Sequence, residues 1–204
     1  MNDFFLYLVI VMTYSIGILG AGNVGKTLGL KWSSTGHKIS FGVRDPTKYS
    51  ELVKEHPNIS VEKSQEIIDS HDILVLALPG RDLGQIMSSF KNLGNKKIID
   101  ATNMYGMNKL QKDFPETSFV KAFNHIGYNI MANPVIENTK TSLLYCGDDK
   151  ELLDIADKLA IDCGFEPFLA GDSSFAQDLE NLAILWIKLS RKIGRNFNFK
   201  LLKS

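Results

Sequence analysis

The 204-residue chain has little cysteine, no excess charge of either sign and no long apolar run after its first dozen residues. Cys146 and Cys163 lie far apart and outside any C-x-x-C pair, which predicts reduced thiols rather than a disulfide framework or a zinc site. The four histidines show no ligand spacing either, so we expect no metal. The 23 basic and 23 acidic residues cancel, which removes the field that would attract nucleic acid or an anionic membrane. We therefore expect a cytoplasmic protein with no nucleic-acid and no membrane partner.

The most apolar part of the chain is its start, with Phe-Phe-Leu-Tyr-Leu-Val-Ile-Val-Met from position 4. This stretch lacks the basic beginning and the small-residue cleavage site of a signal peptide. It is also shorter than the roughly 20 residues that a bilayer span needs. We interpret residues 1–12 as an apolar extension or an artefact of the translation start, and a short extra strand or a membrane-surface tag is the alternative.

One glycine-rich stretch organises the rest of the chain. An apolar run ends at Gly20, glycines recur at Gly22 and Gly25, and helix-compatible residues follow. This is the G-x-G-x-x-G pattern of dinucleotide binding in its strand-to-helix context. The first glycine permits the tight turn, the second lets a pyrophosphate approach the backbone, and the third allows close helix–strand packing. The cofactor-binding residues predicted here are Gly20, Ala21, Gly22, Asn23, Val24 and Gly25.

The same stretch also matches the phosphate loop of ATP- and GTP-binding proteins, because residues 20–27 read G-x-x-x-x-G-K-T. In that interpretation Asp100, after an apolar strand, would help to hold magnesium. Against it stands Arg44, at the position where dinucleotide domains contact the adenosine ribose and an Arg accommodates the 2′-phosphate of NADP. Lys48 would add a second cation, whereas Asp45 before a proline is typical of a helix N-cap. We therefore predict NADP as the cofactor.

Strands and helices alternate along the chain, which predicts the α/β class with a doubly wound (Rossmann) parallel sheet. We expect an NADP-binding domain over residues 13–172 and a C-terminal helical segment over residues 173–204. We interpret the long helix predicted in that segment as a packing and dimerisation element. Its apolar side carries Leu179, Leu182, Ala183, Leu185, Trp186 and Leu189. The predicted strands end at residues 19, 42, 61, 78, 100, 123, 146 and 169.

In open α/β sheets, ligands bind beyond the carboxyl ends of the strands. Four further cofactor-binding residues are predicted there: Leu78, Pro79, Asn103 and Ala122.

The strand that ends near residue 123 supplies the candidate catalytic residues. We expect Asn124, together with the Asn103 carboxamide, to bind the nicotinamide amide, while Phe123 packs inward. His125 could protonate or hydrogen-bond a reduced acceptor. The alternative is that His125 is a polar loop residue without a catalytic role. We expect Lys121 to point to solvent.

Taken together, these motifs resemble the small NADP-binding reductases typified by the deazaflavin (coenzyme F420)-dependent NADP oxidoreductase, whose nucleotide-binding unit the STEAP metalloreductases share. The resemblance covers residues 13–202 and implies hydride transfer between NADP(H) and a flavin- or deazaflavin-like small-molecule acceptor. It also implies a homodimer in which the C-terminal helices close the site. Val43 and Met104 depart from the family, which commonly has Ser and Pro there, and the loop at 105–116 looks shorter. The motifs that carry the resemblance are at residues 20–25, 42–46, 77–79, 100–103, 120–124, 185–187 and 194–201.

Two other functions remain open at this point. Pyrroline-carboxylate reductases use a similar nucleotide domain, so an imine reductase is one alternative. Because no residue is a convincing proton donor, the other alternative is a sensor or regulator that binds NADPH without turnover.

Overall fold

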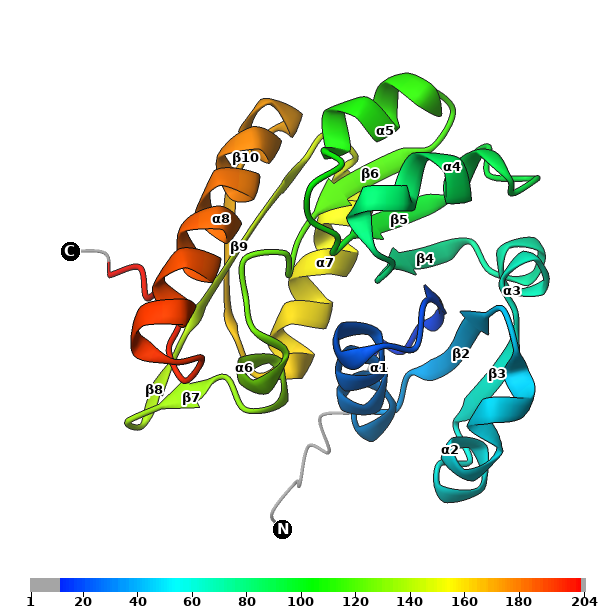
Figure 1. Cartoon of the computed structure of the whole chain (residues 1–204), viewed down its shortest axis with the longest axis horizontal. Coiled ribbons are helices and arrows are strands. Elements are labelled where there is room, and N and C mark those ends of the chain that lie inside the picture. Colours follow the sequence, from blue (N-terminus) through cyan, green and yellow to red (C-terminus); the bar gives the residue numbers. More distant parts are fainter. Residues whose placement is uncertain (1–11, 203–204) are drawn as a thin grey trace, which may run out of the picture.

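A central eight-stranded sheet organises the computed structural model, which describes residues 12–202 (Figure 1). The strand order is β10-β9-β6-β5-β4-β1-β2-β3. Strands β1 to β6 all run parallel, and their order, 3-2-1-4-5-6, is that of the doubly wound dinucleotide-binding fold. The predicted fold class is confirmed. The bounds are β1 Ser15–Leu19, β2 Lys38–Val43, β3 Ile59–Lys63, β4 Ile73–Leu76, β5 Lys97–Asp100, β6 Ser118–Lys121, β9 Ser142–Gly147 and β10 Glu166–Gly171.

The last two strands of the sheet run against the other six. Strand β9 pairs antiparallel with β6, Lys121 facing Cys146, and β10 runs parallel to β9. The chain leaves β6 through α6 (Tyr128–Ala132) and a small hairpin, β7 (Val135–Ile136) with β8 (Thr139–Lys140), and re-enters the sheet reversed. As a consequence, the first half of β9 lies beyond the carboxyl end of β6, beside the loop that follows it.

Two buried apolar clusters lie on opposite faces of the sheet. One packs under α1 (Asn23–Ser34), α6 and α7 (Lys150–Cys163), and the indole Nε1 of Trp32 donates to the Leu159 carbonyl 2.9 Å away. The other packs under α3 (Ser64–Ser70), α4 (Leu83–Ser88), α5 (Met107–Asp113) and α8 (Ala176–Ile193). Helix α2 (Ser50–Glu55) lies beside β3 at the sheet edge. Covering both faces explains the nearly continuous apolar sequence of the central strands.

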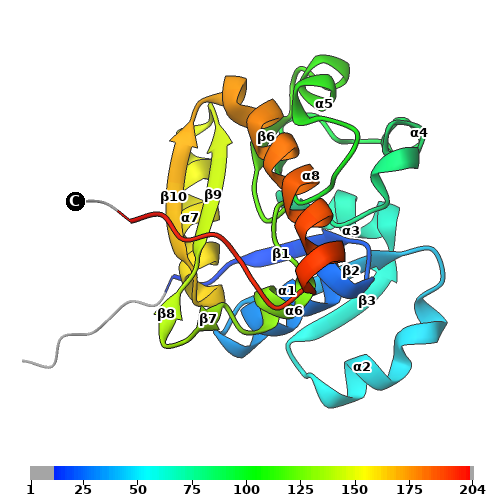
Figure 2. The ribbon, with the colours of Figure 1, turned by 60° about the vertical axis from the view of Figure 1, so that its left-hand side comes forward.

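Helix α8 and the segment after it close the β9 side of the sheet (Figure 2). Of the predicted apolar side of α8, Leu179, Ala183 and Trp186 are buried, whereas Leu185 is exposed. The Trp186 indole donates to the Phe197 carbonyl at 3.2 Å, and the Ser142 amide donates to the Phe199 carbonyl at 3.1 Å. The segment therefore supplies hydrogen-bond partners to the part of β9 that has separated from β6.

None of the helices in the described part of the chain is both long and apolar enough to span a bilayer. The prediction for residues 1–12 lies outside the described residues except for Met12.

Candidate functional site

The three glycines after β1 are required for different reasons. Gly20 has a φ of 108°, and a Cβ on it would lie 2.5 Å from the Ala77 carbonyl oxygen. A Cβ on the buried Gly25 would lie 2.0 Å from the Gly20 carbonyl oxygen. Gly22, in contrast, has no atom within 4 Å of the position a Cβ would take. The first and third glycines thus serve the packing of the turn, and the second leaves open space above it.

Helix α1 points its amino end into that open space. It begins at Asn23, with Gly22 as an N-cap that offers no side-chain hydrogen bond, and its first turn holds no acidic residue. The first N–H groups of a helix lack intrahelical partners and carry the positive end of its dipole, which favours an anion. Because the helix starts before Gly25, residues 25–27 lie within it and form no phosphate loop ahead of it. The ATP interpretation therefore fails on geometry.

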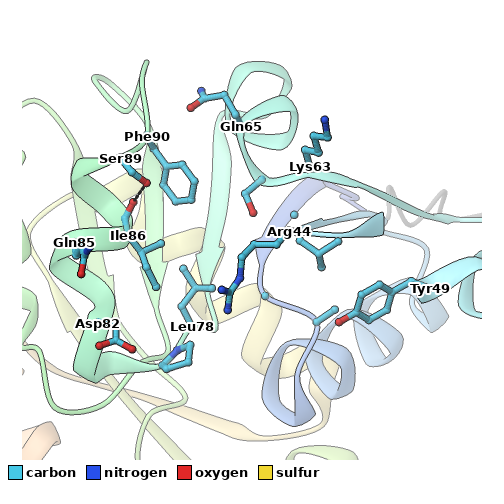
Figure 3. Close-up of a pocket in the computed structure, with 16 residues that line it drawn as sticks. Arg44, Tyr49, Lys63, Gln65, Leu78, Asp82, Gln85, Ile86, Ser89 and Phe90 are labelled. Atoms are coloured by element: carbon cyan, nitrogen blue, oxygen red, sulfur yellow. Dashed lines mark hydrogen bonds between the residues drawn. The ribbon is translucent and has the colours of Figure 1, made fainter. Parts of the chain in front are cut away.

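A cavity of about 710 Å³ lies beyond the carboxyl ends of β1 to β4, where the strand order reverses (Figure 3). This volume suits a small-molecule ligand, for which roughly 300–1,000 Å³ is usual. One wall comes from the loop after β4 and from α4, and the opposite wall from the ends of β2 and β3. The lining residues are Gly20, Ala21, Gly42, Val43, Arg44, Tyr49, Lys63, Ser64, Gln65, Leu78, Pro79, Asp82, Gln85, Ile86, Ser89 and Phe90.

Arg44 extends into this cavity toward Leu78, as Figure 3 shows. Within residues 12–202 its guanidinium has neither a hydrogen-bond nor an ion-pair partner. Asp45 is turned away from the ribose position, because its carboxylate accepts from the Thr47 amide at 3.2 Å and hydroxyl at 2.6 Å. These bonds from Thr47 hold the pKa of Asp45 below its usual range and cap the 3-10 helix Pro46–Tyr49, as predicted.

Lys48 does not line the cavity as the predicted second cation. Its side chain is 75% exposed, and its ammonium lies 3.6 Å from Asp45. The cavity is lined instead by Lys63, Ser64 and Tyr49, which none of the sequence motifs indicates. The sequence could have indicated Lys63 and Ser64 as lining residues, because the junction between β3 and α3 at residues 63–64 is the carboxyl end of another strand.

The predicted pair of asparagines comes together at the carboxyl ends of β5 and β6. The Asn103 Nδ2 donates to the Asn124 carbonyl at 2.9 Å, and the Asn124 Nδ2 lies 3.3 Å from the Asn103 Oδ1 and 3.0 Å from the Leu179 carbonyl. Asn124 is only 5% exposed, and its Oδ1 is a buried acceptor without a partner. Phe123 packs inward against Trp32 and Phe165, as predicted.

The loops after β4 and β5 join the cavity to this asparagine pair. A Cβ on Gly80 would lie 1.5 Å from the Asn103 carbonyl oxygen, so only glycine allows the two loops to touch. Leu78 and Pro79, two of the predicted cofactor-binding residues, line the cavity just before this contact. Ala122 is fully buried, and its N–H donates to the Asp100 carbonyl at 3.2 Å, so Ala122 offers no surface to a ligand.

His125 is also fully buried, which does not fit the predicted exchange of a proton with an acceptor. Burial lowers its pKa to about 4, so the ring is neutral at pH 7. Its Nε2 accepts from the Leu144 amide of β9 at 3.4 Å, in the gap between β6 and β9. The geometry gives His125 a structural role that depends on the reversed direction of β9.

The expectation that Lys121 points to solvent is wrong. Its side chain is fully buried, and its Nζ lies 2.9 Å from the Asp100 carboxylate, 2.7 Å from the Thr102 carbonyl and in contact with the Glu180 carboxylate. Burial alone would lower the pKa of Lys121, but the two carboxylates outweigh it and raise the pKa. Glu180 comes from α8, and no local sequence pattern indicates its contact with Lys121.

Within residues 12–202 no group of three His, Cys, Asp or Glu side chains is arranged to hold a metal.

These features define a dinucleotide-binding protein of the Rossmann type. The model of the family described as "NADP oxidoreductase coenzyme F420-dependent" matches residues 15–104, which hold the glycine turn, Arg44 and Asn103. A crystal structure from Arthrobacter sp. FB24, assigned as an F420-dependent NADP reductase, superposes with a TM-score of 0.82 at 25% identity. The match covers 93% of this chain and 99% of that one. The family model and the solved structure thus confirm the resemblance of the chain to these NADP-dependent oxidoreductases that the motifs indicate.

Two curated relatives are longer proteins. The metalloreductase STEAP3 of Rattus norvegicus is 24% identical over 180 residues, which are 83% of this chain and 36% of that protein. The NADPH-dependent reductive aminase of Aspergillus oryzae is 26% identical over 177 residues, 85% of this chain and 59% of that protein. The chain therefore spans less than two thirds of the length of either.

Proposed function

We propose that the chain binds NADP(H) in the cavity at the switch point, with the pyrophosphate over Gly22 and the 2′-phosphate beside Arg44. The observation that carries this proposal is the contrast among the three glycines, because only the middle one leaves space that the fold itself does not use. The unpartnered guanidinium of Arg44 supports NADP over NAD. A charge-assisted pair to a phosphate would satisfy it.

We further propose that the reaction is hydride transfer to a flavin- or deazaflavin-like acceptor, as the family description suggests. Bound NADPH would supply the hydride, and the proton that completes reduction of the acceptor would come from solvent. The protein's own contribution is placement. The unpartnered Oδ1 of Asn124 would accept from the nicotinamide amide, and Asn103 would hold Asn124 in position. The buried acids near the asparagines, Asp100 and Glu180, are both paired with Lys121, which fits a reaction that needs no protein proton donor.

Reduction of an imine is the second candidate, because one relative is an NADPH-dependent reductive aminase. An imine must be protonated to accept hydride well, and the neutral, buried His125 does not provide that proton. The geometry of this chain therefore favours the flavin-like acceptor.

NADPH oxidation measured with a panel of flavins, a deazaflavin, ferric chelates and cyclic imines tests these proposals. We expect turnover with a flavin or deazaflavin and none with the imines. Turnover with imines alone would reverse the choice of acceptor. NADPH binding without turnover on any acceptor would instead indicate the sensor function.

We also propose that the protein is a homodimer through α8, whose outward side exposes Ile184, Leu185 and Ile187. Light scattering after size exclusion should give a dimer mass for the wild type and a monomer mass for Leu185→Glu. The control is Asn181→Glu, which places the same charge at an exposed polar position on the same helix. A wild-type monomer would contradict the proposal.

A further inference from the structure

Two residues with left-handed backbone flank the asparagine pair. Met104, next to Asn103, has a φ of 82°, and Phe123, next to Asn124, has a φ of 64°. Such a conformation is strained for residues other than glycine and persists only where the surroundings hold it. The buried ring of Phe123 is fixed between Trp32 and Phe165. The Met104 side chain is 77% exposed, so its own packing cannot hold the turn.

Glu180 of α8 stabilises the strained backbone at Met104. Its Oε2 accepts from the Met104 amide at 3.1 Å, and its Oε1 accepts from the buried ammonium of Lys121. Glu180 is only 6% exposed, and the carbonyl of the residue before it, Leu179, accepts from Asn124. The first turns of α8 therefore bind both loops that carry the asparagines.

The chemistry of these contacts requires a carboxylate. Both partners of Glu180, an amide N–H and an ammonium, are donors without acceptor capacity. A carboxylate accepts from both, whereas a glutamine must turn its own donor group toward one of them. We propose that Glu180 is a positioning residue, which fixes the Asn103–Met104 turn and thereby the carboxamides that orient the nicotinamide. The inference rests on the proposed NADP(H) site.

The test compares Glu180→Gln with Asp178→Asn, the matched change at an exposed position on the same helix. Three quantities are measured: the affinity for 2′,5′-ADP, which lacks nicotinamide; the nicotinamide fluorescence of bound NADPH; and the single-turnover rate of hydride transfer to a flavin. We expect Asp178→Asn to match the wild type in all three. Glu180→Gln should keep its 2′,5′-ADP affinity, lose the wild-type nicotinamide fluorescence and slow transfer by about 10- to 100-fold, because small misplacement of a reacting ring is costly.

A second substitution separates positioning from general stability. Glycine adopts a positive φ without strain, so adding Met104→Gly to Glu180→Gln should restore much of the nicotinamide fluorescence and rate. Absence of this rescue would overturn the proposal. So would a Glu180→Gln protein that equals Asp178→Asn, or one that loses 2′,5′-ADP affinity in parallel.

If Glu180→Gln does not fold, two double variants decide the question. Lys121→Met/Glu180→Gln retains an oxygen for the Met104 amide, and Lys121→Met/Glu180→Met does not. Only the first should keep the wild-type nicotinamide fluorescence, and identical behaviour of the two would refute the inference. A wild type that binds neither 2′,5′-ADP nor NADPH would refute the proposed function instead.

Discussion

Substituting the second and third glycines of the turn should separate ligand binding from folding. An alanine methyl at Gly22 meets no atom within 4 Å, and the backbone there has a φ of −77°, which alanine adopts freely. The stability loss should stay below about 1 kcal/mol, the usual range for a helix N-cap. The methyl would, however, occupy the space proposed for the pyrophosphate. Losing one or two charge-assisted hydrogen bonds of about 1.5–3 kcal/mol each predicts NADPH binding at least ~10-fold weaker.

Gly25→Ala is the counterpart, because its methyl would lie 2.0 Å from the Gly20 carbonyl oxygen. The turn must shift, and we expect a lowered melting temperature even without ligand. Thermal unfolding of the free proteins and calorimetric titration with NADPH check both variants. With NADPH at 100 times its dissociation constant, the wild type should gain about 2.7 kcal/mol. Gly22→Ala protein that binds NADPH like the wild type would refute the placement of the pyrophosphate.

Three further substitutions test other parts of the site. Arg44→Ala should weaken NADPH about 10- to 150-fold and leave NADH nearly unchanged in titrations, because the lost pair involves only the 2′-phosphate; equal losses would make Arg44 structural. Asn124→Ala should slow single-turnover hydride transfer far more than it weakens NADPH binding, and an unchanged rate would remove Asn124 from the mechanism. His125 has a folded-state pKa lowered from 6.5 to about 4, so the stability it contributes is complete above pH 6.5 and falls as the pH drops toward 4. In urea titrations across that range His125→Asn should flatten the decline, and an equal slope in both proteins would contradict the buried neutral ring.

The features predicted correctly from the sequence depend on residues close together in the chain. The predicted strand ends at residues 19 and 100 agree with the structure to the residue, and the other predicted strand ends differ by one or two residues. The helix predicted after Gly25 begins earlier in the structure, at Asn23. That difference matters, because the earlier start brings the second glycine to the N-cap. Even so, the spacing of the glycines identified the turn, since each acts on its immediate neighbours.

The errors concern residues whose surroundings come from distant segments. Three short elements, α5, α6 and the β7–β8 hairpin, have too few residues to show a periodic pattern. The direction of β9 depends on how the chain returns through α6 and the hairpin. An alternating strand pattern contains no information on direction, so the antiparallel end of the sheet could not be predicted. The burial of His125 follows from that reversal, because β9 supplies the amide that its ring accepts from.

The two ends of the proposed cofactor site therefore differ in how the chain encodes them. The adenosine end lies within residues 20–90, where strand ends follow one another in order and one motif leads to the next. The nicotinamide end combines Asn103, Asn124 and the α8 residues Leu179 and Glu180, and Met104, next to Asn103, is 76 positions from Glu180. Lys121 belongs to this second end. The alternation of side chains along β6 does not determine whether Lys121 faces solvent or the interior. Its charge can be buried because the carboxylates of Asp100 and Glu180 pair with it. Sequence motifs consequently identify the cofactor, whereas the acceptor depends on long-range contacts that the tertiary fold creates.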